Sequence, residues 1–563
     1  MAASKELKIV SFISKGWTSS RESARYPRLR IGLVFVIAVL AGAGTLAAHE
    51  LDELTLDGWK QLREVERYQL QIAEKYWREQ NWKTAAGEYE KFMELYEESS
   101  GAPYAQLKWS LAQVKLRKQN TAIKEGFQTV IDYWPESQQA IAAAYYVGAT
   151  QREIGRLKEA KVALKAVVSK YPQHLAAVFA LNDLAAVADA ENDVSARVEV
   201  WKKLTFDIKR TPSSSAACGQ ACLSLAIHFF REGAFDEGVK ALATTFDPKA
   251  LPAQVAAYVR QPIFDLTGVP ESKSKGEKLA DQAIAWMKQA TPADRTTDEA
   301  KLLARQALFA IADLTIVARR DDQVAAAHES ILQNFPGDDE ALGRLAAWYK
   351  TKTNYDKARE TYRRFTNKFA GLGQIAFTYR EQQNWAAAVT EYQQLLAQDT
   401  AGKNTWKAEL AMTYRYMQKW PEAIALYEEL YKDDAVNANG WRWQVAQTHQ
   451  GAGQLKEAIG HYRQCTNFPE NYKHMAACHR LLKQPAEAIA LYNQVGAGDK
   501  ASAPWAALQV AYTREEAQQK EAAILAFQQV CKKYPKDAHA SVAHAHLQQT
   551  YKISVTLGGA AEE

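Results

Sequence analysis

The chain has 563 residues, of which 47% are hydrophobic and 24% are charged, the usual proportions for a folded globular protein. Its net charge of +5 gives no reason to expect a nucleic-acid partner, and five thinly spread cysteines exclude a disulfide framework. Sixteen prolines and 28 glycines are few for this length, which favours helices.

The N-terminal segment predicts a membrane or export signal. Residues 1–30 are basic, Ile31–Ala48 carries no charge, and acidic residues come directly after it. A helix over Ile31–Ala48 is about 27 Å long, close to the hydrocarbon thickness of a bilayer. The positive-inside rule then makes residues 1–30 a cytoplasmic segment and exports the rest.

Two interpretations of Ile31–Ala48 stay open. It is either an uncleaved anchor or a signal peptide that is cleaved near Ala48. The anchor predicts a single-pass protein of the cytoplasmic membrane with its remaining residues on the periplasmic side. Cleavage predicts a secreted or periplasmic protein.

A linker helix is predicted over residues 49–64, and a repeated pattern begins after it. The pattern is clearest in EAIALYEEL (Glu422–Leu430), EAIGHYRQC (Glu457–Cys465) and EAIALYNQV (Glu487–Val495). We call the first alanine of each copy the marker and give other positions as offsets from it. The markers recur at intervals of 30 or 35 residues, at Ala358, Ala388, Ala423, Ala458, Ala488 and Ala523.

Two further positions repeat with the marker. Position +4 is aromatic, in Tyr362, Tyr392, Tyr427, Tyr462, Tyr492 and Phe527. Position −12 is small, in Ala346, Ala376, Ala411, Ala446, Ala476 and Ala511. Small residues at −12 and at the marker let two helices of a hairpin approach closely, and the aromatic residue fills the space toward the next hairpin.

This pattern resembles the tetratricopeptide repeat, a helical hairpin of about 34 residues. The N-terminal half agrees with the pattern, with Ala85, Ala160 and Ala196 as markers and a weaker copy near Gly238. Units also end in proline, at Pro135, Pro172 and Pro336. We count eleven or twelve units. The resemblance implies an all-α fold, a right-handed superhelical solenoid of helical hairpins preceded by the transmembrane or signal helix.

We place the domain boundaries where the repeated pattern begins and ends. We predict an N-terminal repeat array over residues 65–245 and a C-terminal array over 300–536. Between them, residues 246–299 carry three proline-bearing polar breaks and are predicted as a degenerate repeat or irregular insertion. A capping helix is predicted over 537–552 and a disordered tail over 553–563.

Motifs of catalysis do not occur in the chain. It has no phosphate-binding glycine loop, no GxSxG and no HExxH, so no enzyme activity, catalytic residue or cofactor is expected. His539, His544 and His546 cluster near the C-terminus, but helical spacing separates them too far for one zinc ion. Cys218 and Cys222 lie four residues apart without a second pair, and His228 is interpreted as a core residue.

The resemblance also implies a binding surface, because ligands of the family commonly contact positions −15, −11, −8 and −7 on the first helix of each hairpin. Positions −15, −11 and −8 share one helical face. They predict a row of cations beside apolar anchors, made of Lys115, Arg152, Lys350, Arg380, Arg415 and Arg480 with Phe377, Met412, Trp443 and Tyr512. Gln450 and Glu515 interrupt the row at position −8.

The sequence therefore predicts a non-enzymatic protein-interaction scaffold, similar to membrane-anchored tetratricopeptide proteins of the bacterial cell envelope. Its concave groove is expected to bind partner proteins or acidic peptide segments, since arginine holds carboxylates with two hydrogen bonds. The alternative is a permanent structural or accessory subunit of an envelope complex for secretion, outer-membrane biogenesis or surface-polymer assembly. Homo-oligomerisation is left open.

Overall fold

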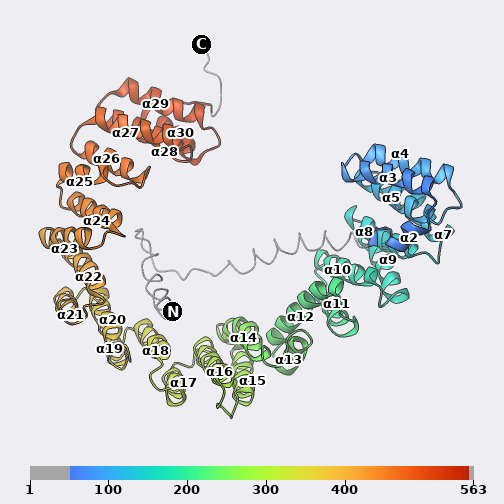
Figure 1. Cartoon of the computed structure of the whole chain (residues 1–563), viewed down its shortest axis with the longest axis horizontal. Helices are drawn as coiled ribbons and strands as arrows, with labels where there is room; N and C mark the ends of the chain where they lie inside the picture. Colours follow the sequence, from blue (N-terminus) through green and yellow to red (C-terminus); the bar gives the residue numbers. More distant parts are fainter. Residues whose placement is uncertain (1–50, 557–563) are drawn as a thin grey trace. The chain divides into compact units, whose positions relative to one another are not determined.

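The computed structural model describes residues 51–556, and helices make up nearly all of this part of the chain (Figure 1). No strand occurs between residues 51 and 556. Within each unit, most successive helices pack against each other in chain order, as in the hairpins α4–α5, α8–α9 and α28–α29. The all-α prediction is confirmed, and the right-handed superhelix stays a prediction.

The first of two compact units comprises the described residues up to Leu303 together with Asp313–Arg319. The helix α16 (Asp298–Val317) contributes residues to both units. The other helices of the first unit are α2 (Leu56–Gln61), α3 (Glu64–Arg78), α4 (Trp82–Leu95), α5 (Ala102–Lys115), α6 (Gln119–Thr121), η4 (Ala122–Phe127), α7 (Gln128–Tyr133), α8 (Gln138–Glu153), α9 (Leu157–Lys170), α10 (Leu175–Ala190), α11 (Val194–Lys202), η5 (Lys203–Asp207), α12 (Pro212–Glu232), α13 (Phe235–Ala243), α14 (Leu251–Thr267), η6 (Pro270–Ser272) and α15 (Lys273–Ala290).

The second unit comprises Ala304–Ala312 and the described residues from Arg320 onward. Its helices are α17 (Asp321–Asn334), α18 (Asp339–Thr351), α19 (Tyr355–Arg363), α20 (Lys368–Glu381), α21 (Trp385–Gln398), α22 (Lys403–Tyr416), α23 (Trp420–Asp433), α24 (Ala438–Gly451), α25 (Leu455–Arg463), α26 (Glu470–Leu481), α27 (Pro485–Gly498), α28 (Ala503–Glu516), α29 (Lys520–Lys533), α30 (Ala538–His546) and η7 (Leu547–Tyr551).

Each hairpin except α14–α15 turns on one residue with a left-handed backbone, five residues before the marker. Gly453 has φ +75° and precedes Ala458, whereas Thr353 has φ +56° and precedes Ala358. The turn ends the first helix and starts the second within a few residues. It also locates the marker independently of sequence: Asn192, at φ +55°, places Arg197 rather than the predicted Ala196 at the marker position.

The repeated small and aromatic residues form the core, as predicted. All six markers of the C-terminal array and all six small residues at −12 have no exposed surface, and the aromatic residues at +4 are at most 5% exposed. The core of the second unit is a series of separate clusters along the chain, such as the one around Tyr392 and the one around Tyr492. Each hairpin therefore buries its apolar face against its neighbours, as repeat proteins do.

The two repeat intervals reflect two lengths of the second helix. The markers in α19 and α25 are followed by the next marker after 30 residues, and both helices have 9 residues. The markers in α21, α23 and α27 are followed after 35 residues, and these helices have 14 residues. The shorter units therefore lose residues at the end of the second helix, beyond the aromatic residue at +4.

Helices also fill the segments where the period lapses. Residues 246–299 contain α14 and α15, a hairpin of 17- and 18-residue helices, with Pro262 inside α14. The predicted linker contains the short helix α2, and the predicted cap contains α30 and η7. Residues 557–563 of the predicted tail lie outside the described residues.

The predicted localisation needs correction. Between residues 51 and 556, none of the helices has the length and the apolar character that crossing a bilayer requires. This finding contradicts the predicted place in the cytoplasmic membrane and its periplasmic alternative, and both are withdrawn. The segments to which these predictions referred, residues 1–30 and Ile31–Ala48, lie outside the described residues.

Candidate partner-binding surface

The predicted binding residues all lie on first helices of hairpins. Two belong to the first unit, Lys115 on α5 and Arg152 on α8. The other eight belong to the second unit: Lys350 on α18, Phe377 and Arg380 on α20, Met412 and Arg415 on α22, Trp443 on α24, Arg480 on α26 and Tyr512 on α28.

The arginines at position −8 each contact the first helix of the following repeat. Arg380 Nη1 lies 2.6 Å from Glu409 Oε2, and Arg415 Nη1 donates to Gln444 Oε1 at 2.8 Å. Arg480 Nη1 donates to Gln509 Oε1 at 2.8 Å. The three acceptors lie at position −14 of their repeats. We call this contact between −8 and the next −14 the inter-repeat clasp.

The clasp recurs in the first unit. Arg152 Nη2 lies 3.2 Å from Asp183 Oδ1. Asp183 lies fourteen residues before Arg197, the residue that the turn at Asn192 places at the marker position. Burial raises the pKa of Asp183, whereas the nearby Arg152 favours its ionised form. Agreement between the two units indicates that the clasp belongs to the repeat geometry.

Position −7 of the following repeat supplies a second acceptor. Lys350 Nζ lies 2.6 Å from Glu381 Oε2, and Arg480 Nε donates to Glu516 Oε2 at 3.0 Å. Positions −14 and −7 are two helical turns apart and share one face. A long cation at −8 can therefore reach either position.

Gln450 and Glu515, which interrupt the cation row, also contact a later helix of the array, but as hydrogen-bond acceptors instead of donors. Gln450 Oε1 accepts from His474 Nδ1 at 3.1 Å, and His474 lies at −14 of the next repeat. Glu515 Oε1 lies 2.8 Å from His546 Nε2 on α30. Position −8 therefore serves the junction between repeats whichever polar residue occupies it.

The apolar members of the surface are held by side chains of the repeat. The ring of Phe377 lies between Lys350 and Arg380, each with its charge 5.1 Å from the ring centroid. Trp443 packs edge-on against Tyr462 and His474. Tyr512 packs edge-on against Phe527, with ring centroids 5.1 Å apart. Such packing fixes these side chains before any partner arrives.

Two predicted residues are exposed. Met412 is 36% exposed, and Lys115 is exposed at the end of α5. The turn residue Arg117 places Ala122 at the marker, so Lys115 lies at −7 rather than at −8. This one-residue difference turns Lys115 away from the clasp position, and it forms no ion pair within the described part of the chain.

Arg415 keeps an uncompensated charge within this surface. Its clasp partner Gln444 is neutral, and Arg415 forms no ion pair among residues 51–556. Met412 precedes Arg415 by three residues on α22 and therefore lies on the same side of the helix. An exposed apolar side chain and an unneutralised guanidinium group thus lie side by side.

Several of the histidines and cysteines noted in the sequence have local partners. His539 Nδ1 contacts Asp537 Oδ1 at 2.7 Å, and His546 contacts Glu515. His228 is half-buried rather than part of the core. Cys218 and Cys222 are buried and free, and Cys222 donates to the carbonyl oxygen of Ala241. These contacts assign no catalytic role to any of these residues.

Hairpins that stack through small residues and contact their successors through recurring side chains define a helical-repeat protein. Models of the tetratricopeptide repeat match residues 142–174, 405–435 and 505–537, which cover most of the hairpins α8–α9, α22–α23 and α28–α29. The chain therefore contains tetratricopeptide repeats. A comparison with curated proteins gave no match.

Three solved structures are similar to this chain. The APC/C hetero-tetramer Cut9–Hcn1 has 12% identity and a TM-score of 0.25, over 88% of this chain and 99% of that one. Naa15/Naa10 bound to HypK-THB has 14% identity and a TM-score of 0.39, over 86% and 71%. Yeast Tom70 has 12% identity and a TM-score of 0.29, over 86% and 97%.

Proposed function

We propose that this chain is a non-enzymatic scaffold that binds partner proteins on the first helices of its repeats. The observation that carries the proposal is the fixed set of aromatic and cationic side chains along these helices. Clasps and ring contacts restrain them, so a partner meets a surface whose side chains lose little further freedom on binding. Restrained aromatic and arginine residues are also the usual anchors of protein interfaces.

The contact point that we assign is the pair Met412 and Arg415 on α22. Arg380 and Arg480 already face carboxylates of their own chain, which an acidic partner would have to displace. Arg415 contacts neutral groups, the amide of Gln444 and the hydroxyl of Tyr427, and retains further N–H donors for a carboxylate. The partner that fits is a segment with an apolar side chain next to Asp or Glu.

Partner capture by two pairs of variants tests this proposal. Met412→Glu and Arg415→Gln alter the assigned contact point. Their controls are Leu525→Glu on the second helix α29, where Leu525 is 59% exposed, and Arg363→Gln at the exposed end of α19. The tagged full chain is purified from its source under mild conditions, bound proteins are identified, and one is reconstituted with each variant.

We expect Met412→Glu and Arg415→Gln each to weaken binding at least about tenfold, roughly the effect of losing one good interface contact. Leu525→Glu and Arg363→Gln should bind as the parent chain does. Equal binding by all four variants would rule out this contact point. A partner that stays bound at high salt and never exchanges would instead identify a permanent subunit of a larger complex.

A pair of synthetic peptides tests the acidic character of the partner. One peptide carries leucines and glutamates, and the other replaces each glutamate by glutamine. Fluorescence anisotropy should show tighter binding of the glutamate peptide at low salt, with the difference shrinking as salt screens the charges. Equal affinity of the two peptides contradicts a carboxylate at Arg415.

A further inference from the structure

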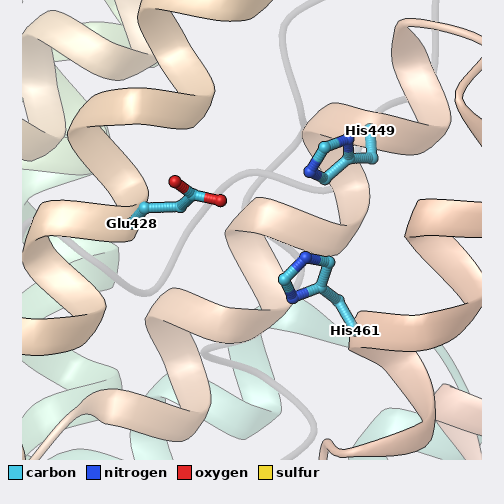
Figure 2. Close-up of side chains that lie close together, drawn as sticks. All are labelled: Glu428, His449 and His461. Atoms are coloured by element: carbon cyan, nitrogen blue, oxygen red, sulfur yellow. The ribbon is translucent and has the colours of Figure 1, made fainter.

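Three side chains with metal-binding atoms meet where two repeats of the second unit join. Glu428 comes from α23, His449 from α24 and His461 from α25. One potential ligand atom from each residue lies within 4.8 Å of the other two. In Figure 2 the carboxylate of Glu428 points toward the two imidazole rings. All three side chains are half-buried, so an ion from solvent can reach them.

The hydrogen bond of His449 uses Nδ1 and leaves Nε2 available to bind a metal. His449 Nδ1 lies 2.6 Å from Gln454 Oε1, and an amide oxygen only accepts. Nδ1 therefore carries the proton, and Nε2 keeps a free lone pair. Metal-binding histidines commonly have this arrangement, in which the other ring nitrogen donates to an oxygen and the ring orientation is fixed.

The ring of His461 lies parallel to that of His449, with centroids 5.2 Å apart and an interplanar angle of 11°. Burial lowers the pKa of His461, and the neighbouring His449 and Arg442 lower it further against the opposing effect of Glu428. Two closely stacked imidazoles are stable when neutral, and neutral imidazole is the form that binds metals.

We propose that Glu428, His449 and His461 bind one divalent transition-metal ion of the zinc class. Two imidazoles and a carboxylate suit zinc and its neighbours, whereas magnesium and calcium prefer oxygen ligands alone. Bonds of about 2.0–2.2 Å place tetrahedral ligand atoms roughly 3.3–3.6 Å apart, so rotations about side-chain bonds must close the present separation. Three protein ligands leave the fourth position to water or to an added ligand.

The combination is absent from the equivalent positions of the neighbouring repeats. Glu428 is at +5, His449 at −9 and His461 at +3 of their markers. One repeat later these positions hold Arg463, His479 and Leu491, and one repeat earlier they hold Gln393, Tyr414 and Leu426. The three ligands therefore do not arise from the repeat pattern.

The positive charge of Arg442 lies near the site and would repel a metal ion, but its guanidinium group is held by Tyr431 and Gln464. Arg442 has its guanidinium carbon 4.6 Å from the ring centroid of Tyr431 and donates to the carbonyl oxygen of Gln464 at 2.8 Å. Glu428 supplies the negative charge that offsets it. A bound ion would join α23 of one repeat to α24 and α25 of the next, and so hold that junction together.

Calorimetric titration of the full chain with zinc chloride tests the proposal. The chain has 11 histidines, so weak additional binding is expected and the tight site is the readout. The parent chain should show one tight site, and zinc should raise its unfolding temperature. His449→Ala, His461→Ala and Glu428→Gln should each weaken that site at least about tenfold, and Gln454→Ala roughly tenfold or more.

His479→Ala is the matched control. His479 also lies at −9, and its Nδ1 contacts Gln484 Oε1 at 2.7 Å, as His449 contacts Gln454. It lacks the other two ligands, so its loss should leave the tight site intact. Cobalt(II) as a second probe should give the visible absorption of a tetrahedral site in the parent chain and in His479→Ala.

Three results overturn the proposal. One is the absence of a tight site in the parent chain. Another is equal zinc affinity for the parent and all three ligand variants, with circular dichroism showing that the variants fold. Equal weakening by His479→Ala and His449→Ala would also overturn it, because binding would then be a general property of the surface histidines.

Discussion

Arg380 Nη1 on α20 lies 2.6 Å from Glu409 Oε2 on α22, and this ion pair joins the first helices of two successive repeats. Arg380 has only 10% of its side chain exposed, and its guanidinium carbon lies 5.7 Å from the ring centroid of Tyr392. The pair therefore belongs to the packed junction rather than to an open groove. A cation in such a place contributes to the stability of the array.

Arg380→Ala should lower the free energy of unfolding by about 2 kcal/mol. The value lies below the 3–5 kcal/mol for breaking a fully buried pair, because Glu409 keeps about a quarter of its surface exposed. Urea unfolding measures the change, and hydrogen exchange in α20–α22 should localise it. Lys115→Ala, at an exposed residue without an ion pair in the described chain, should change stability by less than about 0.5 kcal/mol. Equal effects of the two substitutions would contradict the role of the clasp.

The recurring left-handed turn predicts opposite effects of two substitutions. Thr353 is a β-branched residue at φ +56°, so Thr353→Gly should stabilise the second unit by about 0.5–1 kcal/mol. Gly155 has φ +79°, and a Cβ there would meet nothing within 4 Å, so Gly155→Ala should cost about 0.5–1 kcal/mol through backbone strain alone. Thermal unfolding of each variant checks both signs. Changes of the same sign would show that the turn conformation does not determine them.

The buried tyrosines predict that stability falls at high pH. Burial raises the pKa of Tyr362 from its ordinary value of 10.0 to about 12. Its neutral hydroxyl stabilises the folded state fully below pH about 10, and this contribution is lost as the pH rises toward about 12, since only the unfolded state has released its proton in between. For Tyr362 alone the loss is on the order of 2 kcal/mol.

Urea unfolding between about pH 8 and pH 12 measures this loss, and ultraviolet absorbance detects the tyrosinate. Tyr362→Phe keeps the ring and removes the titrating group, so its stability should fall less across the same range. If the parent and Tyr362→Phe lose the same stability, burial of this hydroxyl does not perturb its ionisation.

The cysteines should be inert in the folded protein. All five are buried and free, and burial raises the pKa of the Cys478 thiol to about 11. Thiolate is the reactive form, so both access and ionisation oppose the reaction. Ellman's reagent at neutral pH should label none of the thiols quickly in the native chain and all five in denaturant. A rapidly labelled thiol in the native chain would show local opening at that residue.

The hairpins could be predicted from the sequence because the residues that pack inside each hairpin recur at the same positions in every repeat. Ala423, Tyr427 and Ala411 recur at fixed offsets, and residues with such spacing meet inside one hairpin whatever the relation between hairpins. The position of Lys115 was one residue off because its repeat lacks the EAIA pattern. Only the turn at Arg117 reveals the correct alignment.

Contacts between repeats were harder to predict. Helical spacing placed Arg380, Arg415 and Arg480 on one face, but it does not tell which residue of the next repeat faces them. That depends on the rotation from one hairpin to the next. The predicted role of these residues in partner binding stays a prediction. A charge reversal at Arg380 would disturb the clasp as well as any partner contact.

The cluster of Glu428, His449 and His461 could not be predicted from the sequence motifs for a related reason. Its members are 12 to 33 residues apart in sequence, and no metal motif has that spacing. The denser group of histidines, His539, His544 and His546, contains none of its members. A comparison of positions −9, +3 and +5 across the repeats would have revealed it, because only one junction has ligand types at all three.

The helices α19 and α25, which are second helices of only nine residues, show where this architecture tolerates a change of length. Both helices keep the turn, the marker and the aromatic residue, and they lack only the residues at the far end of the helix. Nearest-neighbour contacts determine the stability of such arrays. A chain of this kind can therefore gain or lose five residues at that end of a hairpin during evolution, or by engineering, while every junction keeps its fit.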